Sequence, residues 1–179
     1  RLPANLDVTD DTNPYADYHL NQLSDALRNT ELSSPMGYQY SNFGYSVLAE
    51  TLVAFHHQSL DTLLTQSLFK PLNMNHSYLA LENEDHVKAH INALAQGHRF
   101  DGDTTSHWYF DAMAGAGAVV STVDDMVSYI KLMMQPPESQ KDTVETVLEP
   151  RESLSTQTQQ ALGWLIQNKG QQRWAWHNG

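Results

Sequence analysis

The sequence predicts an α+β protein, a mostly helical chain that closes on a β-hairpin, and three observations support this. Apolar residues recur at helical spacing in several segments before residue 150. Apolar and polar residues alternate near the end of the chain, as in a half-buried strand. Proline, glycine and asparagine separate these segments, and 179 residues are enough to bury a core.

Three helices are expected in the first part of the chain. After a turn-rich lead-in over residues 1–17, apolar residues at helical spacing predict a helix over 18–32. A second helix is expected over 42–56, and a third runs over about 60–69 and stops before Pro71, because a residue before proline disfavours the helical conformation. The apolar stripe of the second helix consists of Tyr45, Leu48, Ala49, Leu52 and Phe55.

The middle of the chain gives a weaker signal. Residues 73–113 are polar and irregular, which is unusual inside a compact domain, so we expect short strands or a lid there. Two overlapping capping boxes over 121–125 predict the start of a helix that runs to about Met134 and ends before Pro136. Residues 138–150 are expected to add another helix. Alternation over 161–167 and 172–177, around a turn at 168–170, predicts a β-hairpin.

Composition excludes some classes of function. A formal net charge of −11 makes nucleic acid and anionic membrane surfaces poor partners, because both attract basic patches. The absence of cysteine removes disulfides, thiolate metal sites and cysteine nucleophiles together. No apolar run reaches the length of a membrane span.

Tyr40-Ser41-Asn42 lies at a predicted loop-to-helix junction, where side chains are exposed and backbone N–H groups are unpaired. Such a short motif is a weak signal by itself. In a purely structural interpretation, Asn42 caps the helix and Tyr40 is a half-buried aromatic residue.

Five segments in order give this tripeptide a context. They are YQYSNFGYSVL at 38–48, FKPLNMNHS at 69–77, GAGAVVSTVDDM at 115–126, LGW at 162–164 and HNG at 177–179. Together they resemble the motifs of class C β-lactamases and penicillin-binding proteins, including Y-S-N, P-L-G-M and K-T-G or H-x-G. Asn73 stands where the family has glycine, and asparagine tolerates the left-handed conformation.

The resemblance implies a β-lactamase/transpeptidase-like fold, with a helical lobe packed on one face of an antiparallel sheet. We therefore expect residues 1–179 to be a single partial domain, with the helical lobe over about 15–150 and sheet strands over about 160–179. The parent protein would cleave an amide or ester through an acyl-serine intermediate. β-Lactams, D-amino-acid peptides and short esters are the candidate substrates.

The resemblance also implies site residues. Tyr40 would move protons as general base or acid, and His177, in place of the K-T-G lysine, would supply charge that depends on pH. Asn42 would bind substrate, and so would Asn178 and Gly179, which match the end of the family's K-T-G or H-x-G segment.

The family's nucleophile, the serine of S-x-x-K, lies upstream of Y-S-N, and residues 1–39 contain no such motif. The two matches that do occur, Ser67–Lys70 and Ser128–Lys131, lie downstream and are interpreted as accidental. The nucleophile is therefore expected outside this chain, which would be inactive alone. The alternative is a non-catalytic ligand-binding module of the same fold.

The sequence and the resemblance also indicate which ligands and partners to expect. His86 and His90 are spaced for one helix face, but no H-E-x-x-H or carboxylate pattern supports them, so no metal and no cofactor are expected. The expected partner is a small-molecule or peptide substrate, with self-association over the surface that missing strands would cover. The resemblance implies a periplasmic or cell-envelope location.

Overall fold

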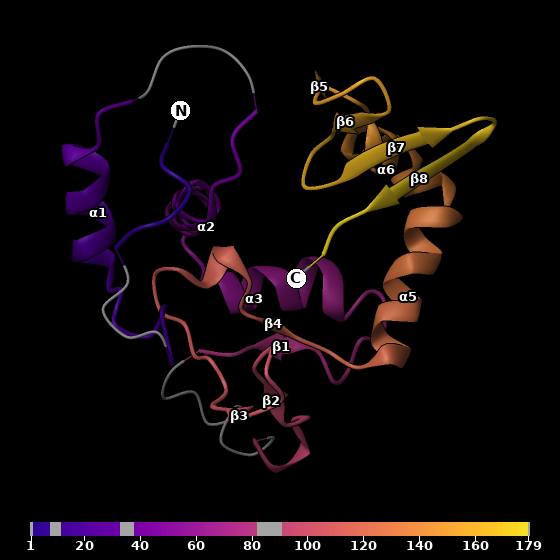
Figure 1. Cartoon of the computed structure of the whole chain (residues 1–179). Helices are drawn as coiled ribbons and strands as arrows, with labels where there is room; N and C mark the ends of the chain where they lie inside the picture. Colours follow the sequence, from indigo (N-terminus) through magenta and orange to yellow (C-terminus); the bar gives the residue numbers. More distant parts are fainter. Residues whose placement is uncertain (1, 8–11, 33–37, 82–90, 179) are drawn as a thin grey trace. The chain divides into compact units, whose positions relative to one another are not determined.

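The computed structural model describes residues 2–7, 12–32, 38–81 and 91–178, and these form two compact units (Figure 1). The first unit contains the described residues up to Asp125 apart from Tyr38, and the second contains Tyr38 and the residues from Met126 onward. The helices come first and an antiparallel sheet comes last, so the predicted α+β class is confirmed. The prediction of one partial domain stays a prediction.

The three predicted helices of the first unit are present. They are α1 (Leu20–Asn29), α2 (Asn42–His56) and α3 (Leu60–Leu64), the last continued by a π-helical turn over Thr65–Phe69. α1 is shorter at both ends than the predicted range of 18–32. The other bounds agree with the sequence because a strong N-cap residue, Ser41 or Ser59, begins each of these helices.

The predicted apolar stripe of α2 is wrong for most of its members. The buried side chains of α2 are Phe43, Ser46 and Ala49, whereas Tyr45, Leu48, Leu52 and Phe55 are exposed. Three of the exposed residues line a shallow apolar pocket of about 200 Å³ together with residues of α3 and of segment 114–119. Periodicity locates an apolar face but does not say how completely the rest of the unit covers it.

The helical segment that starts with α3 ends in a Schellman motif. Met74 N–H donates to the Phe69 carbonyl at 2.8 Å and Asn73 N–H donates to the Lys70 carbonyl at 3.1 Å. Asn73 adopts a left-handed φ of 56°, as its position in the motif requires. Phe69 and Met74, the two positions that usually meet across this motif, are both buried. Asparagine therefore takes the place of the family's glycine in the conformation that was expected.

Short strands occupy the segment that seemed irregular in the sequence. β1 (Tyr78–Leu79) pairs antiparallel with β4 (Val119–Val120), and β2 (Gly97–His98) pairs antiparallel with β3 (Thr104–Thr105). 3₁₀ turns cover Ile91–Ala93 and Ala114–Ala116. Two-residue strands are too short to produce a period-2 pattern, which is why the sequence does not locate them.

The core of the first unit gathers around the start of α2 and the chain between β1 and β4. Its buried members are Leu23, Phe43, Leu79, Ala80, Phe110, Ala112, Met113, Ala114 and Ala118. α2 packs directly on the 3₁₀ turn at Ala114–Ala116. A Cβ atom at Gly115 would lie 2.5 Å from the Tyr45 carbonyl oxygen and 2.7 Å from the Ala49 Cβ, so only glycine fits this approach.

The second unit combines helices with a four-stranded sheet (Figure 1). α5 (Val123–Met134), which starts in the first unit, and α6 (Lys141–Leu148), preceded by a 3₁₀ turn over Glu138–Gln140, agree with the predictions. The antiparallel strands follow in the order β5 (Glu152–Ser153), β6 (Thr158–Gln160), β7 (Leu165–Lys169) and β8 (Gln172–Trp176). The sheet thus begins at Glu152, earlier than the predicted start at about 160. The sequence did not reveal β5 and β6 because both strands are short and polar.

The predicted β-hairpin is confirmed as β7 and β8. Its register pairs Lys169 with Gln172, so the connecting turn is Gly170-Gln171 and not residues 168–170. Gly170 has a φ of 62°, which suits a two-residue hairpin turn. Ile166 is buried, whereas Trp174 and Trp176 are 52% and 40% exposed. Among the described residues, no helix is both long and apolar enough to cross a membrane.

Candidate functional site

Tyr40-Ser41-Asn42 forms the entrance to α2. Ser41 is the N-cap: its Oγ accepts a hydrogen bond from Gly44 N–H at 2.7 Å and donates to the Pro3 carbonyl. Asn42 is the first helical residue, and its backbone N–H donates to the Ala4 carbonyl at 2.9 Å. The interpretation of Asn42 as the cap is therefore wrong, and its side chain is available for another role.

The Tyr40 side chain is 48% exposed, directly before the N-cap. Tyr45 lies one helical turn further along, and burial, followed by the nearby Tyr40 hydroxyl, raises the pKa of Tyr45 above 10.0. Tyr45 is therefore a neutral phenol at physiological pH and adds no charge beside Tyr40. The entrance to α2 thus presents one phenol and one carboxamide, Tyr40 and Asn42, two residues apart.

The Asn42 carboxamide is held by a residue that the sequence does not reveal. Asn42 Nδ2 donates to Tyr15 Oη at 3.1 Å, and Asn5 Nδ2 donates to the same oxygen at 3.2 Å. The Tyr15 ring stacks on Phe110, with ring centroids 5.2 Å apart. Tyr15 and Asn5 belong to the lead-in over 1–17, whose lack of periodicity gave no reason to place it beside the motif.

The other predicted site residues follow strand β8. His177 and Asn178 are both exposed and come directly after Trp176, the last residue of the strand, whereas Gly179 lies outside the described residues. Tyr40 and Asn42 belong to the first unit, and His177 and Asn178 belong to the second. The structure thus presents the described site residues as two pairs, one in each unit.

A buried carboxylate ties the chain after α3 to the start of α5. Asp125 is 5% exposed, and its Oδ2 accepts hydrogen bonds from His76 N–H and from Ser77 Oγ, both at 2.8 Å. Ser121 Oγ lies 2.8 Å from Ser77 Oγ and joins the network. One predicted capping box is half realised, since Asp125 N–H donates to Thr122 Oγ1 at 3.3 Å.

A second group of charges lies between α1, α2 and the segment before the 3₁₀ turn at 114–116. His19 Nδ1 lies 2.6 Å from Asp111 Oδ2, and both side chains are well exposed. Burial, and secondly the charge of Asp111, raises the pKa of Glu50 above 4.5. Within the described part of the chain, no group of three histidines, aspartates or glutamates could hold a metal ion. His86 and His90 lie outside that part.

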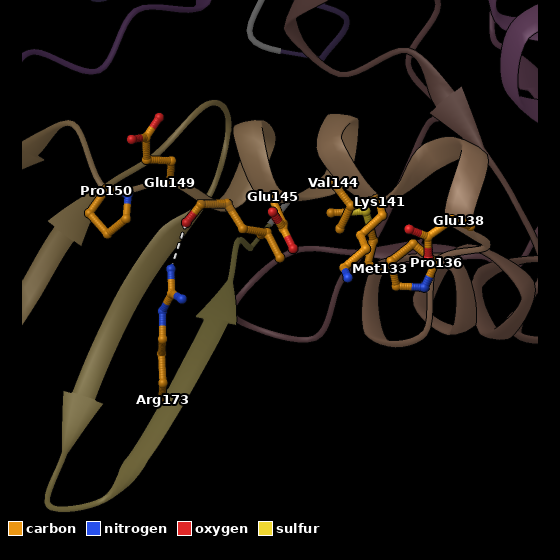
Figure 2. Close-up of a pocket in the computed structure, with 10 residues that line it drawn as sticks. Met133, Pro136, Glu138, Lys141, Val144, Glu145, Glu149, Pro150 and Arg173 are labelled. Carbon is orange, nitrogen blue, oxygen red and sulfur yellow. Dashed lines mark hydrogen bonds between the residues drawn. The ribbon is translucent and has the colours of Figure 1, made fainter.

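One pocket lies in the second unit, and none of the predicted site residues lines it. It has a volume of about 610 Å³ and lies between the end of α5, α6 and Arg173 of β8. The Arg173 guanidinium donates a hydrogen bond of 2.7 Å to the carbonyl of Leu148, the last residue of α6 (Figure 2). The charged residues that line this pocket are three glutamates, Lys141 and Arg173. Its lining contains no serine, tyrosine or histidine that could take part in acyl transfer.

The two S-x-x-K matches lie within helical segments. Ser67 is exposed in the π-helical turn over Thr65–Phe69 and Lys70 follows this turn. Ser128 lies in the middle of α5, with Lys131 one turn later. Their spacing is that of ordinary neighbours on a helix, and the interpretation of both matches as accidental stays a prediction.

Comparison with solved structures identifies the fold. A class C beta-lactamase from Rhodobacter sphaeroides aligns with a TM-score of 0.72 at 19% identity, covering 93% of this chain and 45% of that chain. A beta-lactamase/D-alanine carboxypeptidase from Pseudomonas syringae aligns with a TM-score of 0.74 at 15% identity, covering 95% and 46%. The β-lactamase/transpeptidase-like fold is thus confirmed, and the chain corresponds to slightly under half of these structures.

Curated relatives match at the level of sequence. Protein flp of Staphylococcus aureus is 26% identical over 180 residues, which cover 93% of this chain and 34% of that protein. The unguisins hydrolase ungD of Aspergillus violaceofuscus is 26% identical over 110 residues, 57% of this chain and 19% of that protein. The chain therefore spans about a third or less of the length of these relatives.

The family model for beta-lactamases matches residues 1–179, the whole of the chain. This match agrees with the fold and with the five motifs, the first of which contains Tyr40-Ser41-Asn42. The chain therefore belongs to the beta-lactamase family and is a serine hydrolase-like region.

Proposed function

We propose that this chain is the part of a serine hydrolase that supplies the proton-transfer tyrosine and the substrate-binding asparagine, while the nucleophilic serine lies outside residues 1–179. The complete protein cleaves an amide or ester through an acyl-serine intermediate. The observation that carries the proposal is the position of Tyr40-Ser41-Asn42, fixed at the entrance to α2 in a chain of the beta-lactamase family.

The chemistry assigns a separate role to each residue. Tyr40 takes a proton from the attacking serine or returns one to the leaving group. A tyrosine has an ordinary pKa near ~10, so it needs positive charge nearby to act at neutral pH. In the complete protein, His177 takes the place of the family's lysine and provides part of that charge. Asn42 binds the substrate amide.

The substrate is a β-lactam, a D-amino-acid peptide or a short ester. The names of the aligned structures support the first two classes, since they describe a beta-lactamase and a D-alanine carboxypeptidase. His177 in place of a lysine favours an esterase or a peptidase-like enzyme over a dedicated β-lactamase. We place the complete protein in the periplasm or at the cell envelope.

The proposal is tested by steady-state hydrolysis with the full-length protein that carries this chain. A chromogenic cephalosporin, a D-alanyl-D-alanine peptide and a p-nitrophenyl ester represent the three substrate classes. Tyr40→Phe removes only the hydroxyl, and we expect kcat to fall by roughly 10²- to 10⁴-fold on whichever substrate is cleaved.

Tyr38→Phe is the matched control, because it makes the same change two residues earlier. It should leave kcat within about two-fold of the unaltered protein, as expected for a surface substitution. Equal activity of Tyr40→Phe and the unaltered protein would refute the role of Tyr40. An unaltered protein that binds these compounds without cleaving them would favour the non-catalytic binding module.

A further inference from the structure

A pocket of basic character lies on the β2–β3 hairpin of the first unit (Figure 1). Its volume of about 440 Å³ is sufficient for a small organic molecule. The residues that line this hairpin pocket are His98, Arg99, Thr105, Ser106, His107 and Trp108. They provide a guanidinium, two imidazoles, two hydroxyls and an indole, and no carboxylate. In a chain with a formal net charge of −11, this composition indicates a site for an anion.

Arg99 is the permanent cation of the hairpin pocket. Its side chain is exposed, and it makes no ion pair or hydrogen bond with any described residue. By contrast, Arg28 pairs with Asp25 at 3.0 Å, and Arg151 pairs with Glu149 at 3.3 Å. A guanidinium offers five N–H donors in a planar fork that matches a carboxylate or a phosphate. Arg99 therefore keeps its full capacity to bind an anionic group.

The backbone of the hairpin holds Arg99 in place without using its side chain. Arg99 N–H donates to the Asp103 carbonyl at 2.7 Å, and Gly102 N–H donates to the Arg99 carbonyl at 3.0 Å. Asp103 N–H donates to Asp101 Oδ1 at 3.1 Å, so one carboxylate of the hairpin acts within the turn. Neither Asp101 nor Asp103 lines the pocket.

The other polar side chains add hydrogen-bond donors. Ser106 Oγ donates to the Thr12 carbonyl at 3.1 Å, so its proton is committed. The imidazoles of His98 and His107 and the hydroxyl of Thr105 remain, and an imidazole has at least one N–H donor in either protonation state. An anion bound to Arg99 would thus meet further donors along the same lining.

The Trp108 indole gives the pocket a flat apolar wall. Its ring is 44% exposed, and it meets the edge of the Tyr15 ring at a centroid distance of 5.7 Å. Tyr15 is in turn stacked on Phe110, a buried core residue, at 5.2 Å. The indole is therefore fixed on one side and open on the other, where the ring of a ligand can pack on it.

We propose that the hairpin pocket binds a small organic anion, whose phosphate or carboxylate group is held by Arg99 and whose flat apolar part packs on Trp108. This inference goes beyond the proposed function, because it requires neither Tyr40 nor a nucleophilic serine. It can therefore hold for the 179-residue chain alone.

The test is a ¹⁵N NMR titration of the 179-residue chain with phenyl phosphate, with benzoate and with inorganic phosphate. We expect saturable shifts of the backbone amides over 97–108 with at least one of the two aromatic anions, and the tighter of them identifies the anionic group. That anion should bind at least about three-fold more tightly than inorganic phosphate, because its ring packs on Trp108.

Arg99→Gln should weaken the binding of the tighter anion by about ten-fold or more, the value of a charge-assisted hydrogen bond. Arg28→Gln is the matched control, because it removes the same charge from an exposed arginine outside the pocket. It should change the dissociation constant by less than about two-fold. Equal effects of the two variants, or no saturable shifts over 97–108 with either anion, would overturn the inference.

Benzyl alcohol, a neutral molecule with the same ring, tests the need for charge. We expect it to cause no saturable shift, and binding as tight as that of the anions would contradict an anion site. Trp108→Leu tests the apolar wall. It should reduce the advantage of the aromatic anion over inorganic phosphate to less than about two-fold, and an undiminished advantage would overturn the role of Trp108.

Discussion

At the scale of single residues, two carboxylates show how burial acts on charge. Asp125 is buried but satisfied, because a backbone N–H and a hydroxyl donate to one of its oxygens. Glu50 is partly buried beside another carboxylate, Asp111, and its pKa is raised. The hydrogen bonds to Asp125 stabilise the fold, whereas the ionised form of Glu50 opposes folding.

Asp125→Ala is expected to lower the free energy of unfolding by about 2–4 kcal/mol, because it removes a buried carboxylate that accepts two partly buried hydrogen bonds, from His76 N–H and Ser77 Oγ. Urea unfolding monitored by circular dichroism measures the loss. Asp124→Ala is the matched control in the same first turn of α5, where the side chain is exposed. Its cost should stay below about 1 kcal/mol, the value of a charge at a helix start. Equal costs would contradict the network.

Glu50→Gln is expected to raise the melting temperature at pH 7, because burial and the charge of Asp111 disfavour an ionised Glu50 in the folded chain. A carboxyl pKa that is higher in the folded state makes stability fall as pH rises from about 4.5 through the raised value. The gain should therefore shrink as pH is lowered towards 4, where Glu50 is protonated in both states.

Thermal unfolding across pH 4–7 checks this prediction. Glu145→Gln, at an exposed position of α6, should show no such pH-dependent gain. A gain from Glu50→Gln that stays constant down to pH 4 would mean that the charge of Glu50 is not the cause.

The site could be predicted from the sequence at some residues and not at others. Tyr40 and Asn42 lie in a motif whose letters are contiguous, so the resemblance finds them directly. Tyr15 contributes through a tertiary contact with Asn42, the first residue of α2 and 27 residues further along the chain, and Asn5 contacts the same hydroxyl of Tyr15. No periodicity or spacing encodes such a contact, and it becomes visible only when the side chains are placed.

At the scale of elements, the long periodic segments could be predicted from the sequence, and the short strands could not. Ser41, Ser59 and the left-handed Asn73 mark element ends in agreement with the sequence, because each satisfies backbone groups locally. β5 and β6 were missed because their polar residues give no apolar alternation, and they become strands through pairing, β5 with β6 and β6 with β7. The exposed stripe of α2 shows the same limit, since burial depends on what packs against a helix.

Gly115→Ala tests the closest approach between two elements. An alanine Cβ would meet the Tyr45 carbonyl and the Ala49 side chain, so α2 must move away from the 3₁₀ turn. We expect a loss of about 1–3 kcal/mol in the free energy of unfolding, as in other overpacked cores. Urea unfolding measures it.

The Ala49→Gly background provides the control for this clash. There the cost of Gly115→Ala should be smaller, because one of the two obstructing contacts has been removed. An unchanged cost in that background, or no cost in the unaltered chain, would contradict the direct packing of α2 on the turn.

At the scale of the whole molecule, the chain has an identified fold, and the proposed reaction requires one group beyond its described site residues. It belongs to the beta-lactamase family over residues 1–179 and spans under half of the aligned solved structures. Its described site residues provide a phenol, two carboxamides and an imidazole, and none of them is a serine. The central claim is therefore a division of the reaction, with the nucleophile supplied by another part of the protein.

Intact-mass spectrometry after incubation with a fluorophosphonate tests this claim most directly, because the reagent forms a stable adduct with an activated serine. We predict that the 179-residue chain stays at 20.2 kDa, whereas the full-length protein gains the mass of one adduct. An adduct on the 179-residue chain, mapped to Ser67 or Ser128, would contradict the claim, and so would a full-length protein that gains none.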